Sequence, residues 1–219
     1  MNKQFELYIF DWDGTLMDSV DHIVSSLAAA AADTNMEDLG HESYRNIIGL
    51  GLEEAFYTLY PNADQSQQAA LTERYRHHFF DTSKGKSSLF DGTHDMLSSL
   101  KKEGVKMAVA TGKARRGLNR VFDETGYHGM FKASRCADES GSKPDPRMLH
   151  ELMSELNVAP EKTLMIGDST YDMQMANNAG IDCLAVSYGV HGCKQLEKHT
   201  PLACCENILE LNDWLHAHK

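Results

Sequence analysis

The sequence feature that most constrains the fold is the stretch from Leu7 to Leu16, which reads LYIFDWDGTL. Four apolar residues are followed at once by two carboxylates, Asp11 and Asp13, then by a glycine and a hydroxyl residue. Open α/β sheets carry their chemistry where buried strands of this kind end. Two carboxylates held together repel each other unless a cation or a shared proton separates them. The stretch therefore predicts a strand with a site for a hard divalent cation, such as Mg²⁺, at its carboxyl end.

Two later segments repeat this arrangement of an apolar run followed by polar residues. Residues 106–110 lead into Thr111-Gly112, and residues 163–166 lead into Gly167-Asp168. From residue 93 onward, helical and strand patterns alternate, which favours a mostly parallel sheet with helices on both faces. The expected helices are 93–103, 115–125, 146–156, 171–179 and 208–218, and the expected strands are 106–110, a short one near 131, 163–166 and 183–186. The predicted fold class is α/β.

The roughly seventy residues 17–86 lack strand character. A crossover between neighbouring parallel strands needs only about 10 to 12 residues, so this stretch is far too long for a simple connection. Helical patterns are found in it at 20–32, 42–48, 52–59 and 69–80. We expect a helical cap domain at 17–86, inserted into an α/β core made of 1–16 and 87–219.

Charge and composition restrict the class of partner. The formal net charge of -11 speaks against nucleic acid and against an anionic membrane. The apolar runs are far shorter than the ~20 residues that a membrane helix needs. Five cysteines, an odd set without a Cys-x-x-Cys pair, favour a reducing compartment over a disulfide framework. We expect a cytoplasmic protein, present as a monomer or weak homodimer.

Four short motifs follow one another along the chain: Asp11-Trp12-Asp13-Gly14-Thr15, Thr111-Gly112, Lys143-Pro144, and Gly167-Asp168-Ser169-Thr170-Tyr171-Asp172. In order and spacing they resemble the motifs of the haloacid dehalogenase-like hydrolases, most closely the phosphoglycolate phosphatase-like branch with a helical cap. Each motif alone is a weak signal, but four in order are specific. The resemblance implies a Rossmann-like core and a magnesium-dependent phosphatase that acts on a small phosphorylated metabolite.

The resemblance also implies a role for each polar residue. Asp11 would be the nucleophile that forms an aspartyl-phosphate, and Asp13 the general acid and base. Thr111 and the backbone N–H of Gly112 would hold phosphoryl oxygens. Lys143 would offset their charge and that of Asp11.

The same resemblance gives the metal ligands. Asp11, the backbone carbonyl of Asp13 and Asp168 would bind Mg²⁺, and Asp172 would support a metal-bound water. From the residues alone, Asp168 could instead cap the helix that follows it.

Two other functions fit parts of the pattern. A phosphomutase has the same four motifs but passes the phosphoryl group to a second sugar hydroxyl. A phospho-acceptor signalling module also combines clustered aspartates, a threonine, a lysine and Mg²⁺, but its acceptor lies on a later strand than its acidic pair. Asp13 argues against a dehalogenase, because a halide leaves without a proton.

The substrate is less well determined than the reaction. The loop Ile48-Gly49-Leu50-Gly51 resembles the cap loop that reaches toward the nucleophile in this family, which would bring Gly49 and Gly51 to the substrate. A simple turn between two helices explains these glycines equally well. Phosphoglycolate is the default substrate of the branch.

Overall fold

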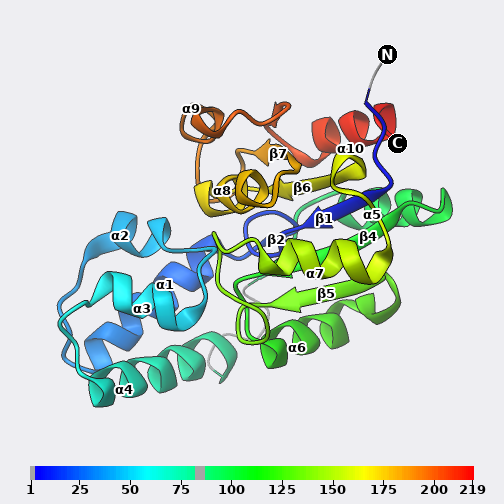
Figure 1. Ribbon diagram of the computed structural model, residues 1–219. Coiled ribbons are helices and arrows are strands. Elements are labelled where there is room, and N and C mark those ends of the chain that lie inside the picture. The colour runs from blue at the N-terminus through cyan, green and yellow to red at the C-terminus, as the bar shows by residue number, and fades with distance from the viewer. Residues whose placement is uncertain (1–2, 82–86) are drawn as a thin grey trace.

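The computed structural model describes residues 3–81 and 87–219, and its centre is a six-stranded parallel sheet (Figure 1). The strand order is β5-β4-β1-β6-β7-β8. These strands are β1 (Leu7–Phe10), β4 (Lys106–Thr111), β5 (Ala133–Cys136), β6 (Thr163–Gly167), β7 (Asp182–Val186) and β8 (Cys204–Cys205). β1 lies in the middle, paired in parallel with β4 and β6. The α/β fold class is thereby confirmed.

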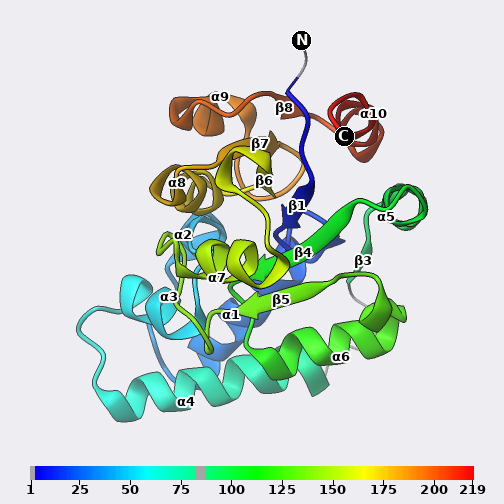
Figure 2. The same cartoon turned by 45° about the vertical axis from the view of Figure 1, so that its right-hand side comes forward.

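Helices cover both faces of this sheet (Figure 2). One face packs against α5 (Thr93–Lys102), α6 (Arg115–Thr125) and α10 (Ile208–Ala217), and the other against α7 (Arg147–Leu156), α8 (Thr170–Ala179) and α9 (Cys193–Leu196). Single 3₁₀ turns occur at η2 (Tyr127–Gly129), η3 (Pro160–Lys162) and η4 (Glu197–His199).

The central strand β1 is buried on both faces, as its unbroken apolar sequence requires. Leu7 and Ile9 contribute to the apolar cluster of α7 and α8, whereas Tyr8 and Phe10 contribute to the cluster of α5, α6 and α10. Trp12 continues the second set, against Phe122, Tyr127 and Phe131 of an aromatic cluster. Alternate side chains of a strand point to the same face of the sheet, so Phe10 and Trp12, on either side of Asp11, are buried in the same cluster.

Four helices form a separate group at one side of the sheet (Figure 1). They are α1 (Val20–Asp33), α2 (Gly40–Asn46), α3 (Leu52–Leu59) and α4 (Gln65–Arg76), and a π-helical turn, η1 (His77–Asp81), continues α4. They share an apolar cluster that includes Leu27, Phe56 and Leu71. The chain enters and leaves this helical group through two short strands, β2 (Met17–Asp18) and β3 (Ser88–Leu89), which pair with each other in antiparallel fashion.

Among the element boundaries that differ from the sequence-based prediction, two have a clear physical reason. The strand expected near 131 lies at 133–136, because Phe131 itself is buried in the aromatic cluster around Trp12. The helix expected from 69 begins at Gln65. Asp64 and Gln67 form a capping box there, which satisfies the free N–H groups of the first turn.

The cysteine prediction was wrong in one respect. Cys193 and Cys204 form a disulfide between α9 and β8, and only Cys136, Cys183 and Cys205 are free, all buried. The bond links two segments that meet only because β8 pairs with β7, so the cysteine spacing did not reveal it. The cysteines therefore no longer favour a reducing compartment. Among the described residues, no helix is long and apolar enough to cross a membrane.

Candidate active site

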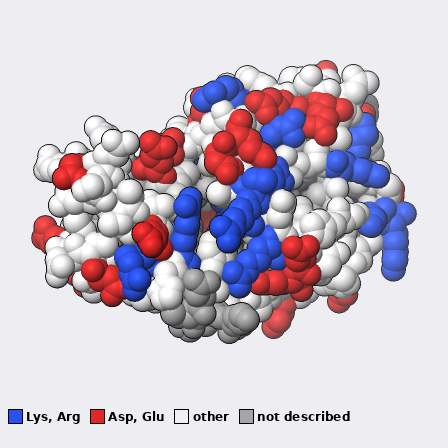
Figure 3. All heavy atoms as spheres, turned by 90° about the horizontal axis from the view of Figure 1, so that it is seen from below, with Lys and Arg blue, Asp and Glu red and all other residues white. Residues whose placement is uncertain are grey.

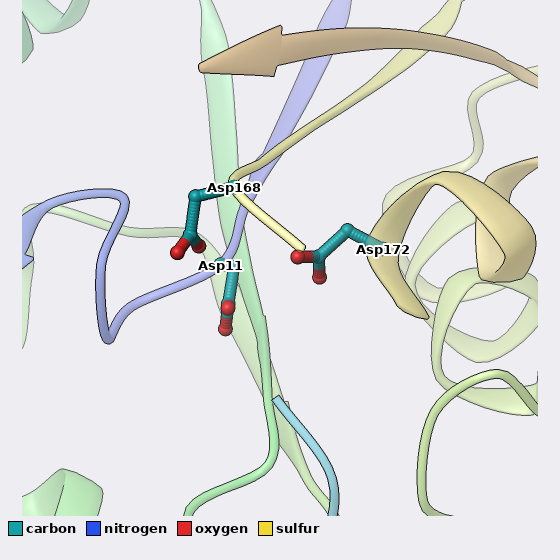
Figure 4. Close-up of side chains that lie close together, drawn as sticks. All are labelled: Asp11, Asp168 and Asp172. Carbon is teal, nitrogen blue, oxygen red and sulfur yellow. The ribbon is translucent and has the colours of Figure 1, made fainter. Parts of the chain in front are cut away.

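Three carboxylates lie together at the carboxyl ends of β1 and β6 (Figure 4). Asp11 follows β1, Asp168 follows β6, and Asp172 comes from the first turn of α8. Each offers an oxygen within 4.8 Å of the others, and all three side chains are buried. The carboxyl edge of a parallel sheet is therefore where the predicted acidic residues meet.

Burial makes it energetically unfavourable for these three carboxylates to be charged so close together. Loss of solvation raises the pKa of Asp11 well above its usual range, and Asp172 and Asp168 raise it further. The pKa of Asp168 is raised to about 7, first by burial and then by Asp172. Three buried carboxylates of this kind fit a divalent cation, because such an ion binds oxygen and favours the ionised form. The donor set thus suits a hard metal ion.

Lys143 is the one positive side chain in direct contact with the cluster among the described residues. It is buried, with its Nζ 2.7 Å from Asp11 Oδ1 and 2.6 Å from Asp172 Oδ1. Burial alone would lower the pKa of Lys143, but the two carboxylates outweigh it and raise this pKa. Lys143 therefore stays charged and neutralises part of the acidic cluster.

Asp168 is held by neighbours on both sides. Thr15 Oγ1 donates a hydrogen bond to Asp168 Oδ1 at 2.8 Å, and the Val190 N–H donates to Oδ2 at 2.7 Å. Gly14 and Gly189 lie so close that a Cβ on either would be 2.1 or 2.2 Å from Asp168 Oδ2. This carboxylate therefore fits only because both neighbours lack a side chain.

The helix that follows is capped by Ser169, so the alternative of Asp168 as the helix cap is wrong. Ser169 and Asp172 form a capping box, in which Asp172 Oδ2 accepts from the Ser169 N–H at 3.0 Å and from its hydroxyl at 2.6 Å. Both oxygens of Asp172 are thus engaged, one by Lys143 and the other by Ser169.

Asp13 faces a different set of partners. Ser19 donates its hydroxyl to Asp13 Oδ1 at 2.6 Å, and Lys113 Nζ lies 2.9 Å from Oδ2. Neither contact was predicted. Lys113 directly follows Thr111-Gly112 at the end of β4, so its place beside a strand terminus was the available signal.

The loop at 48–51 lies against the same edge of the sheet. The Gly51 N–H donates to Ser142 Oγ at 2.7 Å, and a Cβ on Gly49 would be 2.9 Å from Ser169 Oγ. A Cβ on Gly112 would be 2.5 Å from the carbonyl oxygen of Leu50. Gly49 and Gly51 are therefore close-packing residues between the helical group and the sheet.

A cavity of about 820 Å³ opens between the helical group and the sheet. Asp11, Asp13, Thr111, Gly112 and Gly49 line it, whereas Gly51, Asp168, Asp172 and Lys143 lie outside the lining. The structure thus brings all the predicted core residues to one region, with a carboxylate pair facing the cavity.

Comparison with known proteins agrees with this geometry. The family description "Haloacid dehalogenase-like hydrolase" matches residues 8–186. The chain belongs to this family. A relative from Dickeya dadantii named "Probable phosphatase IndB" is 32% identical over 96% of this chain and 94% of its own. The phosphoglycolate phosphatase of Pseudomonas syringae pv. tomato is 31% identical over 94% of this chain and 78% of its own.

Solved structures agree on the fold of this family member. The crystal structure of a hydrolase from Pseudomonas syringae superposes with a TM-score of 0.88, at 22% identity, over 98% of this chain and 99% of the other. The similarity extends through both the sheet and the helical group, because almost the whole chain is covered.

Replacement of Gly14 by alanine tests the packing around Asp168. Gly14 and Gly104 both have φ of +81°, but nothing lies within 4 Å of a Cβ on Gly104. Gly104→Ala should lower the free energy of unfolding by about 1 to 2 kcal/mol, from the left-handed backbone alone. Gly14→Ala should lower it clearly more, because its Cβ must displace the Asp168 carboxylate. Urea unfolding of both variants measures the difference, and equal losses would show that the Asp168 contact is unimportant.

Proposed function

We propose that the chain is a magnesium-dependent phosphatase that hydrolyses a small-molecule phosphate monoester through an aspartyl-phosphate. The observation that carries this proposal is the position of Asp11, which is buried at the end of β1, ion-paired with Lys143 and in the lining of the large cavity. The names of the relatives support it, and phosphoglycolate is the reference substrate. Residues 17–86 would form the cap, and 1–16 with 87–219 the catalytic core.

Asp11, Asp168 and the backbone carbonyl of Asp13 would hold the magnesium ion. When bound, Mg²⁺ would supply positive charge to the phosphoryl oxygens and to the carboxylates that bind it. Asp172 has both oxygens engaged by Lys143 and Ser169, which supports an indirect role. It would orient Lys143 and a metal-bound water.

The reaction would then proceed on the residues that face the cavity. An oxygen of Asp11 attacks phosphorus, and the bond from phosphorus to the leaving oxygen breaks. Asp13 protonates that oxygen and later takes a proton from the water that hydrolyses the aspartyl-phosphate. The hydroxyl of Thr111 and the N–H of Gly112 hold phosphoryl oxygens, while Lys143 neutralises charge next to Asp11.

The nucleophile is tested by Asp11→Asn. The amide has nearly the same shape but cannot form the acyl-phosphate, so turnover should fall by about 10³-fold or more. Circular dichroism and thermal unfolding should stay close to those of the parent protein. Steady-state hydrolysis of 4-nitrophenyl phosphate and acetyl phosphate provides the measurement, and near-normal activity of the variant would exclude Asp11 as the nucleophile.

The acid role is tested by Asp13→Asn. The first step should suffer much less with 4-nitrophenyl phosphate, whose leaving group needs no proton, than with an alkyl phosphate. Single-turnover experiments that follow release of the leaving group compare the two substrates. Asp11→Asn serves as the control that should abolish both reactions, and equal losses in Asp13→Asn would contradict proton donation.

The metal is tested by chelation and by its effect on stability. Exhaustive chelation should stop hydrolysis, and Mg²⁺ should restore it. At about 100 times its Kd, Mg²⁺ should also raise the free energy of unfolding by about 2.7 kcal/mol. Asp168→Asn should weaken both responses. Activity that survives chelation, or a magnesium response that is unchanged in Asp168→Asn, would remove this metal site from the mechanism.

A further inference from the structure

The cavity above Asp11 is larger and more apolar than a two-carbon phosphate ester requires. Its volume of about 820 Å³ is in the range of pockets that hold ligands of drug size. On the basis of the proposed phosphatase function, we infer that the preferred substrate has a bulky, largely apolar leaving group with a second negative charge at its far end. Three sets of contacts support this inference.

The first is an apolar wall supplied by the helical group. Ile23 and Leu27 of α1, Leu52 and Ala55 of α3, and Phe79 and Phe80 of η1 line the cavity. Such a wall favours a leaving group with apolar surface, because both surfaces are removed from water together. A two-carbon acid would leave most of it exposed.

The second is the fixed position of the aromatic pair. The Phe79 ring stacks on His22 with centroids 4.4 Å apart, and Lys113 Nζ lies 4.8 Å from its centroid. Phe80 packs against α6, where its Cζ is 3.6 Å from the place of a Cβ on Gly117. These contacts hold two aromatic rings at one side of the pocket, against which a planar or branched group can pack.

The third is a set of positive side chains in the cavity lining, which also contains the acidic side chains of Glu73 and Asp138. Lys113, Arg116 and Arg120 lie on one face of α6 or just before it, and Arg76 comes from α4. Figure 3 shows Lys and Arg side chains in a band across the middle of the molecular face seen from below. In a chain with a net charge of -11, the four cations named above give this part of the cavity a local attraction for anions.

Two of these cations have no partner of their own in the described part of the chain. Lys113 pairs with Asp13, and Arg120 pairs with Glu124. Arg116 and Arg76 are exposed, and neither makes an ion pair with a side chain described within residues 3–80 and 87–219. A guanidinium group matches the geometry of a carboxylate or phosphate. Arg116 and Arg76 are therefore the groups available to bind a second anion.

The experiment compares two esters of the same shape, 4-carboxyphenyl phosphate and 4-carbamoylphenyl phosphate, with phosphoglycolate as the small reference. The parent protein should have the highest kcat/KM for the carboxylate ester. Arg116→Gln and Arg76→Gln should each lower that value by about 10-fold, as loss of a charged hydrogen bond predicts, and leave the amide ester within twofold. Lys102→Gln, which removes the same charge from an exposed position of α5, should change neither.

Binding separates this inference from the proposed function. Calorimetry with the non-hydrolysable 4-carboxybenzylphosphonate and 4-carbamoylbenzylphosphonate should show tighter binding of the carboxylate, lost in Arg116→Gln and Arg76→Gln. Such binding without turnover of any ester would contradict the phosphatase proposal alone. Equal binding and equal kcat/KM for the two matched compounds would overturn the second-anion site. A higher kcat/KM for phosphoglycolate than for both aryl esters would overturn the bulky leaving group.

Discussion

The contact on which the site depends is the buried ion pair of Lys143 with Asp11 and Asp172. Burial and the repulsion of neighbouring carboxylates raise the pKa values of Asp11 and Asp168, so these two groups would otherwise tend to take up protons. Lys143 supplies one positive charge at 2.7 Å and 2.6 Å from two of the three carboxylates. Loss of one partner of a buried pair costs about 3 to 5 kcal/mol, so charge balance constrains the fold as well as the chemistry.

One lysine does not balance three carboxylates. Asp168 accepts hydrogen bonds from Thr15 and Val190, but neither donor carries a charge. The remaining negative charge lies between β1 and β6, where the parallel register places Phe10 beside Ile166 and brings both strand ends to one level. A cation bound there would complete the balance, and this is the physical reason for a metal requirement in the proposed mechanism.

Much of this arrangement could be predicted from local sequence. The apolar runs before Asp11, Thr111 and Asp168 predict three strands, which the structure shows to be neighbours, and parallel strands place their carboxyl ends together. The same reasoning missed Lys113, because a basic residue after a strand resembles any solvated lysine until its partner is known. It also missed the disulfide. Cys193 and Cys204 come together because β8 pairs with β7, and the spacing of the cysteines does not predict that pairing.

The charge distribution of the cavity was equally hidden in the sequence. Arg76 and Arg116 are forty positions apart, and a lone arginine in a helix is by itself no sign of a shared site. They share a cavity because η1 packs on α6, where Arg120 donates a hydrogen bond to the Phe80 carbonyl at 3.1 Å. Properties that arise from two elements in contact are not visible in either element alone.

One of the connections between the helical group and the acidic cluster runs through the peptide segment Gly189-Val190. Arg45 of α2 donates from Nε to the Val190 carbonyl at 2.9 Å and from its Nη2 to the Gly189 carbonyl. The N–H of the same Val190 donates to Asp168 Oδ2. Movement of α2 away from the sheet must therefore break charged hydrogen bonds, worth about 1.5 to 3 kcal/mol each, next to the residue that positions Asp168. The position of α2 and the position of the Asp168 carboxylate therefore depend on the same peptide segment.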